Sequence, residues 1–381
     1  MATRIGARPT VAHVDLDALA ANAAAITGLL ADGARRSGRT APGVIGVVKA
    51  NAYGHGAGPV ALALEAAGVA MVACADVEEG VALREAGVRG PILVFGALSV
   101  SDLGGIFEAN LTPTLSTPFA GRALQREATR RGVRLRCQLK IDTGMNRLGF
   151  RHDNLRNTMP ELRGHDRLEI TSIYTHFATA DDPESPGLDE QRTRFETARG
   201  VVTSLGLPAV PAHAANSAAL LRDERVWLDA VRPGLLLYGL VPPPLMSTLA
   251  LRPVLSLTSR VVAVKGVRPG EAVGYGGRYP VETPRTLAVV PAGYADGLDT
   301  RLEGRGVALV RERRVPIVGS VCMDMLTVDV SGLDAEPGDE VVLLGRQGDE
   351  RIDVREVAAA IGAIPYELLC RLGSRIQRIY T

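Results

Sequence analysis

The feature that most constrains the fold is an alternation of short apolar runs with helix-length segments, which extends from about residue 40 to residue 240. Residues 44–48 form a β-branched run, and residues 57–67 follow it with a helical pattern that ends at Gly68. Residues 76–86 begin at an aspartate and end before Gly87, as helices prefer. Strands that alternate with helices pair in parallel through right-handed crossovers. The alternation therefore predicts an α/β fold with a parallel sheet.

Eight apolar runs of this kind are present. They are residues 44–48, 69–73, 91–95, 111–115, 135–141, 168–174, 209–213 and 226–231. Eight strand–helix units in about 200 residues predict a (β/α)8 barrel of the TIM type. An open, doubly wound sheet is the alternative. It is disfavoured because the turn after the first strand reads KANAYGHG and not G-x-G-x-x-G.

The pattern of apolar runs changes after the proline-rich segment 241–246 (VPPPLM). Short strand-like runs then follow, and Gly and Pro, which are typical of turns, separate them at short intervals. These runs are residues 254–264, 287–290, 307–310, 315–318, 326–330 and 340–344, with one helix at about 354–361. We therefore predict a barrel domain over 1–244 and a mostly-β C-terminal domain over 245–381. The first strand, about 11–16, is expected to pair with the C-terminal domain.

Charge and composition argue against several classes of function. The formal net charge is +1, so neither a nucleic-acid surface nor a polybasic membrane patch is indicated. No stretch approaches the ~20 apolar residues of a membrane span, and residues 1–9 lack the apolar run of a secretory signal. The four cysteines form no C-x-x-C pair and the histidines have no metal spacing. These features predict a cytoplasmic protein without a metal, nucleic-acid or membrane partner.

Polar residues gather directly after the predicted barrel strands. They are Lys49, Tyr53 and His55 after the first strand, Lys140, Asp142 and Arg147 after the fifth, His176 after the sixth, His213, Asn216 and Ser217 after the seventh, and Arg232 and Gly234 after the eighth. The active sites of such barrels lie at the C-terminal ends of the strands. We therefore expect these side chains to converge on one face.

Lys49 and the last two loops together suggest a phosphate-bearing cofactor. Burial behind a β-branched run lowers the pKa of a lysine and makes it a nucleophile; the alternative is a lysine that extends to the rim. The loops after strands seven and eight are the usual phosphate site of such barrels. Here Ser217 offers a hydroxyl and Gly234 lets a backbone amide approach an anion. A phosphate cofactor bound to a lysine as a Schiff base fits this arrangement.

These motifs, in this order, resemble the alanine racemase family. The matching blocks are VVKANAYGHG, KIDTGMNRLGF, YTHFATAD, HAANSAA, VRPGLLLYGL, VGYGGRY, PAGYADG and CMDM. The resemblance extends from about Val11 to the C-terminus, which is nearly the whole chain. It implies an isomerase that interconverts L-alanine and D-alanine with pyridoxal 5'-phosphate, and it links the chain to the supply of D-alanine for peptidoglycan.

The resemblance also implies a role for each site residue. Lys49 carries the cofactor as a Schiff base and is one catalytic base, and Tyr275 is the other. The remaining cofactor-binding residues are Tyr53, Ser217, Gly234 and Leu235 around the phosphate, Asn216, Arg232 at the pyridine nitrogen, and His176 between Arg232 and Tyr275. Arg147 and Met323 bind the substrate, and Lys140 corresponds to a lysine that is often carbamylated. Family members are homodimers in which the tyrosine and the CMD segment reach into the partner's barrel.

The proposed chemistry needs two bases because racemisation removes the Cα proton on one face and returns a proton on the other. A phenol with a pKa near ~10 needs a positive neighbourhood to ionise, and a His176–Arg232 chain supplies one. Arg232 stays charged and cannot accept a proton, so we expect the ring nitrogen to stay unprotonated. Asp324 is interpreted as a residue that orients the loop of Met323.

Three alternatives remain open at this point. Barrel-type amino-acid decarboxylases share the two-domain plan and use a cysteine in the second domain, which Cys322 superficially matches, but they place an acidic residue where Arg232 stands. Single-barrel pyridoxal-binding proteins lack a second domain. Within the racemases, Ser374 replaces a tyrosine that many members have near the phosphate. A racemase for serine, or one with broad specificity, is therefore also possible.

Overall fold

The computed structural model describes residues 8–97 and 103–381, so the prediction about a signal at residues 1–9 lies largely outside the described residues. Contacts divide the chain into two compact units. The first, called the barrel unit, contains residues 18–52 and 57–252. The second, called the β unit, contains residues 8–17, 53–56 and 253–381 of the part that the structure describes. None of the described helices is long and apolar enough to cross a membrane.

The barrel unit is built on eight parallel strands. They are β2 (Gly43–Val47), β3 (Met71–Cys74), β4 (Ile92–Val94), β5 (Thr112–Leu115), β6 (Leu135–Asp142), β8 (Leu168–Tyr174), β9 (Ala212–His213) and β10 (Ala230–Val231). Each strand pairs with the next in this order, and β10 pairs with β2, which closes the barrel. A short strand, β7 (Phe150–Arg151), extends β6 outside this ring. The predicted (β/α)8 barrel is confirmed.

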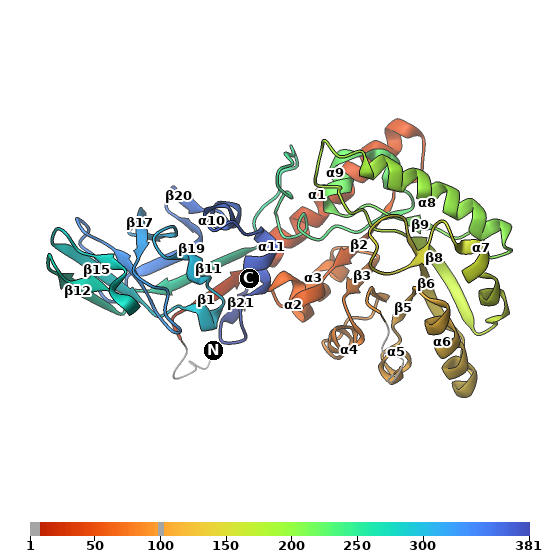
Figure 1. Ribbon diagram of the computed structural model, residues 1–381, viewed down its shortest axis with the longest axis horizontal. Coiled ribbons are helices and arrows are strands. Elements are labelled where there is room, and N and C mark those ends of the chain that lie inside the picture. The colour runs from red at the N-terminus through yellow and green to blue at the C-terminus, as the bar shows by residue number, and fades with distance from the viewer. Residues whose placement is uncertain (1–7, 98–102) are drawn as a thin grey trace. The chain divides into compact units, whose positions relative to one another are not determined.

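Helices cover the outside of the barrel (Figure 1). They are α1 (Leu16–Ser37), α3 (Ala57–Ala66), α4 (Val77–Glu85), α5 (Gly104–Glu108), α6 (Pro118–Arg131), α7 (Leu155–Thr158), α8 (Gly187–Ser204) and α9 (Ser217–Arg222), with 3-10 turns η1 (Pro160–Gly164) and η2 (Glu224–Val226). The predicted cap of α4 is present, since the Asp76 side chain accepts a hydrogen bond from the amide of Glu79. Small aliphatic residues such as Ile45, Ala73 and Leu93 fill the interior, in keeping with an aromatic content of only 4%.

The β unit contains a ten-stranded sheet. Its strands run in the order β12 (Ala263–Val267), β15 (Arg285–Val290), β18 (Leu326–Asp329), β17 (Arg313–Val318), β16 (Val307–Val310), β19 (Glu340–Gln347), β11 (Leu255–Arg260), β1 (Val11–Val14) and β21 (Gln377–Tyr380), with β20 (Glu350–Ile352) beside β19. β1 thus lies between β11 and β21, antiparallel to the first and parallel to the second. The mostly-β C-terminal fold is confirmed.

The β unit also contains short elements outside the large sheet. They are the hairpin β13 (Ala272–Val273) and β14 (Tyr279–Pro280), the turns η3 (Tyr275–Gly277), η4 (Tyr294–Asp296) and η5 (Thr300–Leu302), and the helices α10 (Val354–Ala360) and α11 (Pro365–Cys370). One detail of the sequence interpretation was wrong: residues 254–264 are not a single strand. The chain leaves β11, which pairs with β19, and enters β12, which pairs with β15 at the other end of the sheet.

Candidate active site

Lys49 stands at the start of an unusual turn, α2 (Lys49–Tyr53), directly after β2. The next residues, Ala50, Asn51, Ala52 and Tyr53, all have φ between 52 and 54°. Each L-residue in this left-handed region costs roughly 1–2 kcal/mol. The surrounding structure holds the turn, because the Ala50 amide donates to Glu79 Oε1 (2.6 Å) and the Ala57 amide donates to Asn51 Oδ1 (2.8 Å). The position of Lys49 is therefore fixed by contacts from the rest of the barrel unit.

Arg232, which follows β10, is the most connected polar side chain of the barrel interior. It is 3% exposed. Its guanidinium donates to the carbonyls of Thr175 (2.7 Å) and Ala214 (2.9 Å) and to Nδ1 of His213 (2.7 Å), and its Nη2 lies 3.3 Å from Nδ1 of His176. Burial lowers the pKa of Arg232 to about 10. Arg232 therefore remains a cation at neutral pH, as the sequence interpretation requires.

The contacts of Arg232 fix the tautomers of two histidines. A guanidinium can only donate, so Nδ1 of His213 must carry the lone pair. Its Nε2 then carries the proton and donates to Gln138 Oε1 (2.8 Å). The same argument gives His176 a protonated Nε2. Burial, followed by the charge of Arg232, lowers the pKa of both rings well below the usual range, so both are neutral.

Tyr174, at the end of β8, provides an aromatic platform between these groups. Its ring stacks on His213 with centroids 4.8 Å apart, and the Arg232 guanidinium lies 5.2 Å and the Lys140 Nζ 5.6 Å from its centroid. The Thr114 hydroxyl donates to Val94 O, so it must accept the proton of the Tyr174 hydroxyl (2.7 Å). Burial raises the pKa of Tyr174 to about 12. Tyr174 is therefore a neutral anchor for two cations.

Cations gather at the strand ends, as predicted. Lys140 is 4% exposed, and burial together with the charges of Arg147 and Arg232 lowers its pKa to about 8. Lys49 contributes to the same shift, whereas Asp142 opposes it. Lys140 and Arg232 lie over the same Tyr174 ring, while Lys49 and Arg147 follow the ends of the barrel strands β2 and β6. The cluster formed by Lys49, Lys140, Arg147 and Arg232, called here the cationic cluster, favours anionic ligands.

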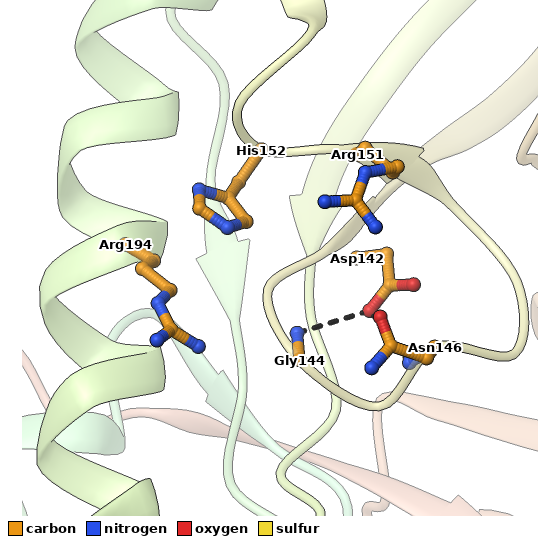
Figure 2. Close-up of a pocket in the computed structure, with 6 residues that line it drawn as sticks. All are labelled: Asp142, Gly144, Asn146, Arg151, His152 and Arg194. Carbon is orange, nitrogen blue, oxygen red and sulfur yellow. Dashed lines mark hydrogen bonds between the residues drawn. The ribbon is translucent and has the colours of Figure 1, made fainter.

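The loop after β6 presents Arg147. Oδ1 of Asp142 accepts the amides of Gly144 and Asn146, both at 3.0 Å, which turns the loop sharply (Figure 2). Arg147 itself is exposed. A cavity of about 290 Å³ lies beside this loop. Its lining residues, drawn in Figure 2, are Asp142, Gly144, Asn146, Arg151, His152 and Arg194. None of the predicted cofactor-binding residues lines this cavity, so it is not the predicted cofactor site.

The two loops predicted to hold a phosphate, after β9 and after β10, are joined by hydrogen bonds. Ser217 begins α9, which Asn216 caps by accepting the amide of Ala219. Oγ of Ser217 accepts the amide of Gly234 at 2.9 Å and that of Leu236 at 3.4 Å. The Ser217 hydroxyl proton is thus available to an anion, whereas the Gly234 amide already has an acceptor. Leu235 lies in the same turn and is 1% exposed.

Tyr53, Tyr275 and Met323 belong to the β unit, not to the barrel unit. Tyr53 packs against Tyr366 with centroids 5.9 Å apart, and burial raises its pKa. Tyr275 is 78% exposed and Met323 is 52% exposed. The structure brings their two loops together, because the Ser320 hydroxyl donates to the carbonyl of Tyr275.

The sequence interpretation missed several residues of the site. His213 is expected among the strand-end residues but without a catalytic role, and the structure shows that it links Arg232 to Gln138. Tyr174 ends a strand directly before the T-H of the motif YTHFATAD, which was a usable signal. Tyr294, in the block PAGYADG, is 45% exposed, and its amide donates to the carbonyl of Cys322, which precedes Met323. The hydrogen-bond partners themselves come from distant parts of the chain, and spacing along the sequence could not reveal them.

A closed barrel with a lysine after its first strand and a cationic cluster at its strand ends, together with a separate β unit, defines a class of two-unit barrel enzymes. Residues 14–242 match the family described as "Alanine racemase, N-terminal domain", and residues 254–380 match "Alanine racemase, C-terminal domain". The chain therefore belongs to the alanine racemase family.

Individual relatives agree with this assignment. The alanine racemase of Symbiobacterium thermophilum is 40% identical over 377 residues, which is 98% of each chain. Among solved structures, alanine racemase from Bacillus anthracis with bound L-Ala-P is 34% identical, with a TM-score of 0.90 over 98% of this chain and 95% of that one. Alanine racemase from Streptomyces coelicolor A3(2) is also 34% identical, with a TM-score of 0.88 over 98% of each chain.

Proposed function

We propose that this protein interconverts L-alanine and D-alanine with pyridoxal 5'-phosphate held on Lys49. The observation that carries the proposal is the cationic cluster around a buried Arg232 whose contacts fix it as a donor. A decarboxylase of the same plan needs an acidic residue at this point. The names of the relatives, and the L-Ala-P bound to one of them, support alanine as the substrate.

The donor set fits a phosphate-bearing, electron-poor ring. The Ser217 hydroxyl, the backbone around Gly234 and Leu235, Asn216 and Tyr53 would hold the phosphate, and Arg232 would face the ring nitrogen. Pyridoxal phosphate, when bound, withdraws electrons from the substrate Cα and so makes its proton removable. Arg232 keeps its own proton, because even its lowered pKa of about 10 lies well above neutral pH.

Two residues of this chain would move the proton. The amine of Lys49 serves one face of Cα, and the phenol of Tyr275 serves the other. Nδ1 of His176 faces Arg232 and its Nε2 is protonated, so Nε2 is free to donate a hydrogen bond to the phenolate of Tyr275. A donor at this point stabilises the phenolate and lowers the pKa of the phenol.

The remaining cations would bind the substrate. Arg147, which is exposed at the end of its loop, would bind the carboxylate together with the backbone of Met323. Lys140, once carbamylated, would carry a negative charge among Arg147 and Arg232 and hold Arg147 in place. We further propose a homodimer in which Tyr275 and Met323 act in the partner's barrel; their exposure supports this. A cytoplasmic location and a role in peptidoglycan synthesis stay predictions.

A direct assay tests the proposal. Purified protein loaded with the cofactor is incubated with L-alanine, and D-alanine is measured; the assay is then repeated with L-serine. Formation of D-alanine supports the proposal, and release of carbon dioxide would assign the chain to the decarboxylases. A comparable rate with serine would instead support the broad-specificity alternative suggested by Ser374.

Borohydride reduction is expected to attach the cofactor covalently to Lys49. The chain has only three lysines, Lys49, Lys140 and Lys265, so peptide mass spectrometry identifies the labelled amine without ambiguity. Lys49→Ala should abolish the labelling, and Lys265→Ala is the matched control that should leave it unchanged. A label on Lys140 or Lys265 in the unaltered protein would refute the assignment.

Carbamylation of Lys140 is expected to increase with pH. Only the neutral amine adds carbon dioxide, and the pKa of Lys140 is about 8 in the folded protein, against about 10.4 in an unfolded chain. The unmodified ammonium therefore destabilises the fold at pH values below about 8, and this penalty disappears as the pH rises towards the unfolded value. With ¹³C-bicarbonate, a carbamate NMR signal should be strong near about pH 9 and weak near about pH 6. Its persistence in Lys140→Ala would contradict the assignment.

A further inference from the structure

The turn between α11 and β21 is fixed by one arginine of the C-terminal strand. The guanidinium of Arg378 donates to the carbonyls of Leu372 (2.7 Å), Gly373 (2.7 Å) and Ile376 (2.8 Å), all within the turn. Its Nε donates to the carbonyl of Gly54 at 3.0 Å. Residues 372–376, called here the C-terminal turn, are therefore held in one conformation by charged hydrogen bonds.

Arg375 projects from this turn to two carboxylates that come from different segments of the β unit. Its Nη2 donates to Asp324 Oδ1 at 2.6 Å, and its Nε lies 3.3 Å from Asp296 Oδ1. Asp324 directly follows Met323, and Asp296 closes the turn that begins at Tyr294. One guanidinium thus joins two loops.

Asp296 needs this charge more than Asp324 does. Its side chain is 1% exposed, whereas that of Asp324 is 50% exposed. Oδ2 of Asp296 accepts the amide of Gly293 and a proton of Arg8, both at 3.0 Å. Oδ1 has no hydrogen-bond donor among the described residues, because the contact with Arg375 is close but poorly aligned. A buried carboxylate oxygen of this kind depends on a nearby cation.

The two loops are also in direct backbone contact. The amide of Tyr294 donates to Cys322 O and that of Ala295 to Met323 O, both at 3.0 Å. A Cβ at Gly293 would lie 2.3 Å from Cys322 O and 2.4 Å from Met323 O. The backbones therefore lie as close as they can, and the Tyr294 and Met323 side chains remain 45% and 52% exposed.

We propose that Arg375 is a positioning residue for substrate binding: by bridging Asp296 and Asp324 it fixes the loop that presents Met323. The substrate role of Met323 rests on the function proposed above, whereas the bridge rests on the geometry alone. Arg375 is 39% exposed and its partner Asp324 is 50% exposed, and an exposed ion pair of this kind contributes little to overall stability. Its loss should leave the fold intact, since Asp296 keeps Arg8, and should displace the loop.

Arg375→Gln tests the proposal. We expect KM for alanine to rise about tenfold while kcat changes less than about twofold, because the loop binds substrate and does not transfer the proton. Arg375→Lys should restore part of the loss, since an ammonium can bind one carboxylate but not both. Arg311→Gln is the matched control: Arg311 is 38% exposed and binds Asp339 and Glu336 of the same unit in a similar way.

Asp324→Ala should reproduce the effect of Arg375→Gln, and the double variant should be no worse than either single variant, because all three lack the contact between Arg375 and Asp324. Hydrogen exchange gives a readout that does not depend on activity. Exchange at the amides of Tyr294 and Ala295 should accelerate in Arg375→Gln and not in Arg311→Gln. If the unaltered protein fails to racemise alanine, the proposed function falls, while the exchange measurement still tests the bridge. An unchanged KM, a fall in kcat alone, or unchanged exchange would overturn the inference.

Discussion

Tyr275→Phe is expected to lose about 10³-fold in racemisation, the usual contribution of a general acid or base, while it retains the cofactor. Tyr275 is 78% exposed in its own chain, so removal of its hydroxyl takes nothing from the packing of the β unit. Tyr279→Phe, in the strand β14 of the same hairpin, is a matched control that should keep nearly full activity.

The loss should differ between the two enantiomers. Lys49 is intact in Tyr275→Phe and can still remove the proton from D-alanine, whereas removal from L-alanine depends on the missing phenol. Exchange of the Cα proton in heavy water, measured separately for each enantiomer, gives this ratio. Equal slowing for L-alanine and D-alanine would show that the assignment of the two bases is wrong or that another step limits both.

The barrel could be predicted because its strands are recognisable in the sequence. Buried parallel strands are continuous apolar runs, and each of the eight predicted runs contains or overlaps a strand of the closed ring. The predicted ends of the strands were less accurate. Residues 226–231 yield only β10 at Ala230–Val231, because the 3-10 turn η2 extends into the run as far as Val226 and Leu228 then turns the chain with φ 53°.

The long helix α1 (Leu16–Ser37) shows the limit of an alternation argument. It has no strand of its own before it in the barrel, since β1 pairs in the sheet of the β unit. Its buried Asn22 donates to the carbonyls of Leu237 and Arg252. Those partners lie more than two hundred residues away in sequence, so spacing could not predict this contact.

The sequence predicted where the charged residues of the site lie. It did not predict the hydrogen bonds between them. Lys49, Lys140, Arg147 and Arg232 were all expected at the strand ends from the sequence alone. The tautomer of His213 depends on Gln138 on one side and Arg232 on the other, and the three residues lie in, or directly after, three different strands. The left-handed turn at Ala50–Tyr53 was equally hidden, because no residue there favours positive φ strongly.

Mixing two inactive variants is expected to restore about a quarter of the wild-type activity if each site takes Lys49 from one subunit and Tyr275 from its partner. Lys49→Ala and Tyr275→Phe are unfolded and refolded together in equal amounts, and each is refolded alone as a control. Random pairing makes about half of the dimers mixed, and each mixed dimer then has one site with both residues intact and one with neither. If both residues came from the same chain, no pairing could restore a site.

The reciprocal mixture makes the test sharper. Wild type is refolded with an equal amount of the double variant Lys49→Ala/Tyr275→Phe. With shared sites, every site of a mixed dimer lacks one residue, so about a quarter of the activity remains, all of it from wild-type dimers. With sites formed within one chain, each mixed dimer keeps one whole site and about half of the activity remains. The two mixtures therefore give equal activity in the shared arrangement, and zero against one half in the other. The second pattern, with mixed dimers verified by native mass spectrometry, would place Lys49 and Tyr275 in the same chain's site and remove the basis for a shared active site.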